Sequence, residues 1–167
     1  MATTAAATAS AGFAQRKQAL WRIASILGAN EMLTITAGPF TFGARFEEAA
    51  APKTCSAVKA LLPYRQKLIH VRWSGEACWV PLGDLDLGLP YENHTSYPAP
   101  GDMLLYPGGI SETEILLAYG GVQFASKMGQ LAGNHFITTT EGRENLAALG
   151  KHVLWQGAQD IQIDWRV

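Results

Sequence analysis

The stretch that decides the fold spans residues 33–46 and reads LTITAGPFTFGARF. Apolar and polar side chains alternate on both sides of Gly38-Pro39, a dipeptide that is typical of turns. A period of two places successive side chains on opposite faces of a strand, so each half of this stretch has one apolar face. We therefore predict a β-hairpin with strands over 33–37 and 40–46.

Two short helices and several more short strands follow this hairpin. Pro52 suits the first position of a helix and Pro63 ends one, which predicts a helix over 52–62. A second helix is predicted over 141–149, before Gly150. The remaining strands are predicted over 68–73, 77–80, 102–106, 113–119, 136–140 and 160–167, with a long loop over 84–100. The pattern indicates a mainly β fold, a closed antiparallel barrel capped by the two helices.

The composition indicates one soluble domain without a nucleic-acid partner. Of the 167 residues, 48% are hydrophobic and 16% are charged, and the net charge is -1. Such a surface does not neutralise a phosphate backbone, and no apolar run approaches the ~18–20 residues of a membrane helix. The two cysteines, Cys55 and Cys78, do not form a zinc motif. We therefore expect a cytoplasmic protein with no metal, no cofactor and no membrane partner.

Residues 1–30 differ in character from the rest of the chain. The first part, MATTAAATASAG, carries no charge and little to pack, which predicts a disordered tail. From Phe13 onwards apolar side chains recur at roughly helical spacing, which predicts an accessory helix. This basic, acid-poor segment also resembles a mitochondrial presequence, and an addition foreign to the protein is a third alternative. The barrel domain is expected over 31–167.

The order of the pieces resembles that of the cyclophilins. The predicted hairpin is followed by APKT at 51–54, at the start of a helix, and then by a strand that contains IHVR at 69–72. The glutamine-glycine-glycine-aspartate segment of the peptidyl-prolyl isomerases is replaced here by WVPLGD at 79–84. Prolyl isomerisation is therefore the least favoured activity.

Several further motifs carry a closer resemblance. They are HVRWSGE at 70–76, PGD at 100–102, YPGG at 106–109, ETE at 112–114 and GNHF at 133–136. On these motifs the chain, over about residues 33–167, resembles a cyclophilin-like family of unknown function of the DUF3830 type. That family is related to the cyclophilin-like domain of cucumopine and mikimopine opine synthases. The resemblance implies a cyclophilin-like barrel. It also implies a condensation in which an amino acid and a 2-oxo acid form an imine and a ring carbon closes onto it, a Pictet-Spengler-type cyclisation.

A second hairpin suggests where a ligand would bind. If Ser74-Gly75 is a two-residue turn, the pairing places His70, Arg72 and Trp79 on one face of the sheet. A guanidinium is always charged and costly to bury unpaired, whereas its fork of donors suits a carboxylate. We therefore predict a pocket floor that binds a carboxylate. The alternative is an exposed strand face on which Arg72 lies over Trp79.

Four titratable side chains are candidates for acid–base catalysis: His70, Glu112, Glu114 and His135. Glu112 and Glu114 lie two apart in an extended segment and point the same way. In a shared site the pKa of one of them would rise. The alternatives are hydrogen-bonded structural histidines and carboxylates that lie in solvent.

Other side chains are candidates for contact with the substrate. Trp73 and Trp79 offer flat apolar walls, Tyr106 ends a strand near the expected rim, and Glu76 lies at the hairpin tip. The alternatives are tryptophans of the core and a solvated glutamate. Lys127 could form an imine if it were desolvated, although a surface position is the more common one for lysine.

Together these features favour an enzyme of lyase or cyclase type. It would act without a cofactor, by acid–base chemistry, on a small molecule that carries a carboxylate or an amine. The alternatives are a non-catalytic module that binds a small molecule or a peptide and, less favoured, a peptidyl-prolyl isomerase. The alternating final strand, 160–167, could pair with a second copy and give a homo-oligomer.

Overall fold

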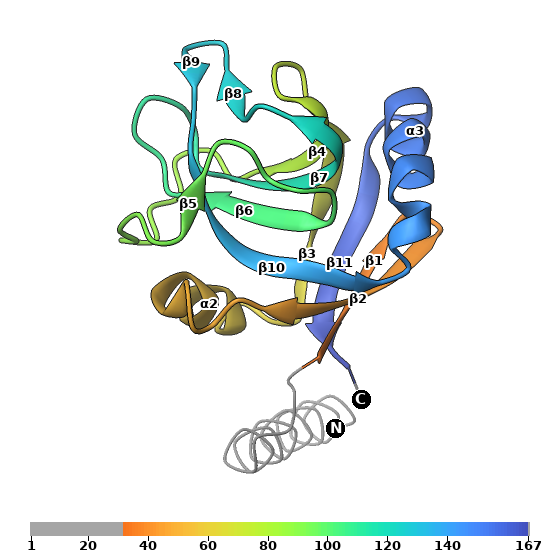
Figure 1. Ribbon diagram of the computed structural model, residues 1–167, viewed down its shortest axis with the longest axis horizontal. Coiled ribbons are helices and arrows are strands. Elements are labelled where there is room, and N and C mark those ends of the chain that lie inside the picture. The colour runs from red at the N-terminus through yellow and green to blue at the C-terminus, as the bar shows by residue number, and fades with distance from the viewer. Residues whose placement is uncertain (1–31, 167) are drawn as a thin grey trace, which may run out of the picture. The chain divides into compact units, whose positions relative to one another are not determined.

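A closed antiparallel barrel is present within residues 32–166, the part of the chain that the computed structural model describes (Figure 1). Its strands are β1 (Met32–Ala37), β2 (Phe40–Phe46), β3 (Tyr64–His70), β4 (Gly75–Pro81), β6 (Asp102–Tyr106), β7 (Glu114–Val122), β10 (Gly133–Glu141) and β11 (Gln159–Trp165). Around the barrel they follow the order β2-β1-β11-β3-β4-β7-β6-β10, and β10 pairs back onto β2. The predicted fold class is confirmed.

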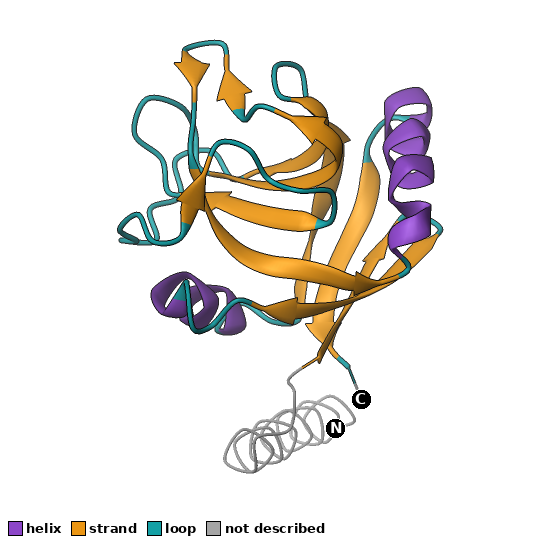
Figure 2. Ribbon diagram, viewed as in Figure 1, coloured by secondary structure: helices purple, strands orange, loops and turns teal. Residues whose placement is uncertain are grey.

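Short elements complete the described part of the chain. They are the helices α2 (Pro52–Lys59), η1 (Arg143–Asn145) and α3 (Leu146–Gln156) and the strands β5 (His94–Thr95), β8 (Ala125–Ser126) and β9 (Gly129–Gln130). β5 adds to β10, while β8 and β9 form a small sheet of their own. Figure 2 shows the helices α2 and α3 beside the strands, and their buried apolar residues belong to the core cluster that fills the barrel.

The first hairpin forms as the sequence predicts. β1 pairs with β2 from Met32 opposite Arg45 to Ala37 opposite Phe40. The alternate residues Leu33, Ile35 and Ala37 are buried in the core that fills the barrel. The alternation of the sequence therefore sets the inward face of the strand that begins the fold.

Both predicted helices are present, with different bounds. α2 begins at the predicted Pro52 and ends at Lys59, before the predicted Leu62. α3 begins after η1 and runs through Gly150 instead of ending there. It ends before Gly157, whose φ of 82° lies in the left-handed region that favours glycine.

The predicted register of the second hairpin is wrong. β3 ends at His70 and pairs with β4 through Ile69 opposite Trp79 and His70 opposite Cys78, so that residues 71–74 form a loop. Cys78 is fully buried in the barrel interior. Because His70 pairs with Cys78 and not with Trp79, His70 faces the same side of the sheet as Cys78, whereas the next residue, Trp79, faces the other side. His70 and Trp79 therefore lie on opposite faces, and the predicted face with His70, Arg72 and Trp79 does not form.

A second apolar cluster lies on the outer face of the barrel. Its buried members are Ala77, Leu104, Tyr106, Leu116, Phe124 and Leu131. They come from β4, β6 and β7 and from the segment that leads into and out of the small β8–β9 sheet. This segment covers part of the outer face of the three strands, so the side chains beneath it are buried. Polar side chains on that face can therefore be buried as well.

One buried amide anchors the long loop between β4 and β6. The Asn134 side chain of β10 donates to Thr54 Oγ1 at 3.0 Å and to the Pro90 carbonyl at 2.9 Å. Its Oδ1 accepts from the Glu92 backbone N–H at 3.0 Å. The Glu92 carboxylate in turn accepts from the Thr54 backbone N–H at 2.6 Å, which satisfies a free donor in the first turn of α2. The loop, α2 and the barrel are thus tied together.

Replacing Asn134 by alanine should lower the free energy of unfolding by roughly 1–3 kcal/mol, because buried partners lose their hydrogen bonds. Chemical denaturation measures that loss. Hydrogen exchange should show faster exchange at the Glu92 and Thr54 amides. Asn145→Ala, at an exposed position, is the matched control. Unchanged exchange at both amides would contradict the anchoring role.

The predicted tail and accessory helix of residues 1–30 lie outside the described residues. Among residues 32–166, no helix has the length and apolar character that crossing a bilayer requires.

Candidate functional site

A pocket of about 380 Å³ lies on the outer face of β4 and β7. Trp79 and Pro81 of β4 and Glu114 of β7 line it from the barrel wall. Three other segments complete the lining: the loop 71–74 between β3 and β4, residues 111–112 before β7, and residues 125–127 at β8. The outward turn of Trp79 described above brings its indole to this face.

Glu114 is a buried acid that lines this pocket. The residue is 7% exposed, and its carboxyl makes no hydrogen bond or ion pair with another residue of the described part of the chain. Burial, and after it the negative charge of Glu112, raise the pKa of Glu114 to about 8. An acid of this strength is largely protonated at neutral pH and can both release and retake a proton.

The indole of Trp79 is the second polar group of the lining without a partner. Its Nε1–H is buried and has no hydrogen-bond acceptor among residues 32–166. Buried polar groups in proteins are nearly always hydrogen-bonded, so each exception needs an explanation. The unpartnered Trp79 indole and the buried Glu114, which line the same pocket, single this region out as a candidate site.

Arg72 and Trp73 lie on the loop at the edge of the pocket. Trp73 is 60% exposed, and Arg72 is exposed without an ion pair to any residue in 32–166. Ser74, only 3% exposed, fixes the end of this loop. Its Oγ donates to the Ala125 carbonyl at 3.0 Å and accepts from the Ala125 N–H at 3.1 Å. The loop that carries Arg72 is therefore fastened to β8 on the neighbouring wall.

The structure separates the predicted site residues into two groups. Arg72, Trp73, Trp79, Glu112 and Glu114 line the pocket, whereas His70, Glu76, Tyr106 and His135 do not. Glu112 is exposed, and its Oε2 accepts from the Gly83 N–H at 3.2 Å.

Both ring nitrogens of His70 are engaged on the inner side of the sheet. Nδ1 lies 2.8 Å from the Val71 carbonyl oxygen, which can only accept, so Nδ1 carries a proton. In the neutral imidazole, Nε2 then accepts from the Tyr119 hydroxyl at 2.8 Å. His70 thus holds Tyr119 of β7 and the start of the loop with Arg72, and its ring does not line the pocket.

Glu76 and Tyr106 also have partners of their own. The Glu76 carboxylate accepts from the Gly121 N–H at 2.7 Å and lies over Gly120. Tyr106 is buried in the second apolar cluster, and its hydroxyl accepts from the Ile110 N–H at 3.1 Å. Both contacts fasten neighbouring loops to the sheet.

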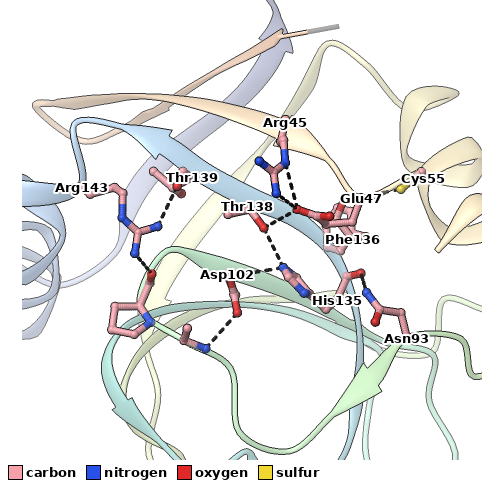
Figure 3. A network of polar contacts seen from close by, with 12 residues as sticks. Arg45, Glu47, Cys55, Asn93, Asp102, His135, Phe136, Thr138, Thr139 and Arg143 are labelled. Atoms are coloured by element: carbon pink, nitrogen blue, oxygen red, sulfur yellow. Dashed lines mark hydrogen bonds and ion pairs between the residues drawn. The ribbon is translucent and has the colours of Figure 1, made fainter. Parts of the chain in front are cut away.

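His135 belongs to a separate polar network, which Figure 3 shows on β10 and its neighbours. Its Nε2 lies 3.3 Å from Asp102 Oδ1 and 3.0 Å from Thr138 Oγ1. Thr138 donates to Glu47 at 2.6 Å, and Arg45 pairs with the same Glu47 oxygen at 3.0 Å. Burial opposes the charged imidazolium, but the hydrogen bond and charge of Asp102 and the charge of Glu47 outweigh it and raise the pKa of His135. The network joins strands on a part of the wall outside the pocket lining.

The model of one protein family, described as a protein of unknown function (DUF3830), matches residues 33–165. The chain belongs to this family.

This DUF3830 chain is also similar to a solved structure described as the structure of McbB in complex with tryptophan. The TM-score is 0.59 and the identity 14%, over 79% of this chain and 44% of the McbB chain. The DUF3830 chain thus spans less than half the length of that protein, and at this identity the likeness concerns the fold. No curated protein matches the chain in sequence.

Sequence reasoning missed part of the pocket of this DUF3830 protein. Ser74 was assigned to a turn, and Ser111 and Ser126 were not considered. These residues come from segments far apart in the chain, and no local pattern shows that they meet. Across residues 32–166, no group of three or more histidine, cysteine, aspartate or glutamate side chains is placed to hold a metal ion.

Proposed function

We propose that the protein is a small-molecule enzyme that transfers protons with Glu114 while Arg72 holds a carboxylate of the substrate. The observation that carries this proposal is the buried Glu114 carboxyl, which lacks a partner in the described chain and lines an open pocket. Acids buried for structural reasons are usually paired or hydrogen-bonded. A strongly shifted acid in a cleft is instead typical of a catalytic group.

Glu114 can serve in both directions of a proton transfer. At neutral pH it holds its proton, because its pKa is raised to about 8, and can give it to a nitrogen or oxygen of a bound molecule. The carboxylate left behind is poorly solvated and feels the charge of Glu112. It therefore takes a proton back readily from a later intermediate.

Arg72, Trp73 and Trp79 supply the binding surface. The guanidinium offers a fork of donors that matches a carboxylate. The two indoles offer flat apolar surfaces that suit a planar, aromatic body. A substrate with an aromatic body, a carboxylate near Arg72 and a basic atom near Glu114 fits this lining.

The finer form of the proposal is ring closure onto an imine. An amine and a carbonyl compound condense to an imine with loss of water, and Glu114 protonates the imine nitrogen. An electron-rich ring carbon then bonds to the imine carbon, and the ring loses its proton to the Glu114 carboxylate. The sum is amine plus carbonyl compound giving product plus water, with no net oxidation. The resemblance seen in the sequence supports this chemistry, and the fold neighbour solved with tryptophan makes tryptophan a reasonable first probe.

Incubation of the protein with tryptophan and pyruvate should yield a product whose mass is the sum of both minus water and whose NMR spectrum lacks the proton of the reacting ring carbon, which the isomeric imine would keep. Arg72→Ala should weaken tryptophan binding about tenfold or more, while binding of tryptamine, which lacks the carboxylate, should change little. Calorimetry and mass spectrometry provide the two readouts. Arg65→Ala, at an exposed position of β3, is the matched control.

Different outcomes separate the alternatives. Tryptophan that binds and is returned unchanged with every carbonyl partner would favour a non-catalytic binding module. If Arg72→Ala weakens the binding of tryptophan and of tryptamine equally, Arg72 does not recognise the carboxylate.

A further inference from the structure

We propose that the natural substrate carries two anionic groups, as a dicarboxylate does, and that Lys127 binds the second of them beside Arg72. This inference rests on the proposed function and narrows its substrate class. It begins from the charges of the lining: Arg72 and Lys127 are the cationic side chains among the residues that line the pocket.

Neither cation is neutralised within the described part of the chain. Arg72 and Lys127 are exposed and form no ion pair with another residue in 32–166. By contrast, Lys67 pairs with Asp160 and Arg166 pairs with Glu141. The two cations of the pocket are therefore available to anions from solvent.

The fold brings these two cations to neighbouring walls. Arg72 precedes Ser74 by two positions, and Lys127 follows Ala125 by two positions. Ser74 and Ala125 are joined by the pair of hydrogen bonds at 3.0 and 3.1 Å, and the Ser74 carbonyl also accepts from the Gln123 N–H at 3.1 Å. Ser74 thus acts as a positioning residue that holds the Arg72 loop against the segment with Lys127.

The acids of the pocket offset only part of this positive charge, because Glu112 alone contributes a negative charge at neutral pH. Glu114 is protonated at neutral pH because burial raises its pKa. Glu112 lies on another segment of the lining, where its carboxylate already accepts from the Gly83 N–H. Two cations on separate segments suit two separate anionic groups, each with its own charge-assisted hydrogen bonds.

Calorimetric titration at pH 7 with matched acids tests the proposal. Glutarate and adipate should bind at least tenfold more tightly than butyrate and hexanoate. Lys127→Ala should remove this advantage and leave hexanoate binding unchanged, whereas Arg72→Ala should weaken both classes of acid. Lys151→Ala, at an exposed position of α3, is the control for the loss of one positive charge.

The positioning role of Ser74 has its own readout. Ser74→Ala should reduce the affinity for adipate, and Ser74→Thr, which keeps the hydroxyl, should restore part of it. In the Lys127→Ala background Ser74→Ala should have a much smaller effect on adipate. Ser96→Ala is the matched control, because Ser96 Oγ fastens the other end of the same small sheet, at Leu131 and Gln130.

The outcomes distinguish this inference from the proposed function. Equal affinity for mono- and dicarboxylates, or tighter binding of inorganic phosphate than of any dicarboxylate, would overturn the dicarboxylate proposal and leave the acid–base site standing. If no acid of either class binds, both proposals fail.

Discussion

Glu114→Gln is expected to make the protein more stable and inactive, and the gain in stability should grow with pH. The folded carboxyl keeps its proton up to about pH 8, whereas the unfolded chain releases it near the ordinary value of 4.5. Between these values the unfolded state binds fewer protons than the folded state, so the free energy of unfolding falls as pH rises. Above about pH 8 the loss is complete. Glutamine resembles the protonated acid and does not titrate, so the variant escapes this loss.

The expected difference between Glu114→Gln and the wild type is near zero at pH 4.5. It approaches an upper value of about 5 kcal/mol above pH 8, from about 1.4 kcal/mol for each unit of pKa shift. Melting curves at pH 5, 7 and 9 measure it. Glu144→Gln, at an exposed position, should show no such trend. A constant difference between Glu114→Gln and the wild type across this range would show that Glu114 is ionised in the folded protein.

The same variant should lose catalysis without losing the binding site. Removal of a general acid lowers rates by roughly 10²–10⁴-fold. Since Arg72, Trp73 and Trp79 remain, the affinity for tryptophan should stay within a few-fold of that of the wild type. If Glu114→Gln is more stable, still binds tryptophan and no longer catalyses the reaction, Glu114 is a catalytic acid and not a structural one. An unchanged rate would remove Glu114 from the mechanism.

The barrel could be predicted from the sequence because its signal is local. The alternation over 33–46 reports directly which side chains of β1 and β2 face the interior. The register of β3 and β4 could not be predicted from the local sequence. Ser74-Gly75 is compatible with a tight turn, but the Ser74 hydroxyl bonds to Ala125, which is remote in sequence. The burial of Cys78 then fixes the pairing, and neither contact can be read from the hairpin alone.

The candidate site could be predicted in part for the same reason. The spacing of Glu112 and Glu114 predicts that the pKa of one of them rises in a shared site. In the structure, burial and the charge of Glu112 raise the pKa of Glu114. Which glutamate is affected depends on burial by segments 71–74 and 125–127, which the spacing does not report. Similarly, His135 has no obvious partner in the sequence, yet the barrel places Asp102 and Thr138 beside it.

Gly150 of α3 packs directly against the Tyr119 ring of β7, and Gly150→Ala should be strongly destabilising. A Cβ at this position would lie 2.4–2.5 Å from carbon atoms of the Tyr119 ring. Either α3 moves away from β7, or the Tyr119 ring moves and its hydroxyl loses the hydrogen bond with His70 Nε2. Overpacking of this kind costs about 1–3 kcal/mol, which exceeds the roughly 0.5–1 kcal/mol that alanine gains over glycine inside a helix.

A second background turns this prediction into a test of the contact itself. In Tyr119→Ala the ring is absent, so Gly150→Ala should become stabilising through helix propensity alone. Thermal or chemical denaturation of the wild type, both single variants and the double variant gives the coupling between the two positions. Ala148→Gly, on the exposed face of α3, reports the propensity effect without the contact. Because Tyr119 bonds to His70 and His70 bonds to the Val71 carbonyl beside Arg72, the clash should also weaken carboxylate binding. Destabilisation by Gly150→Ala that persists in Tyr119→Ala would place its cause elsewhere in the helix.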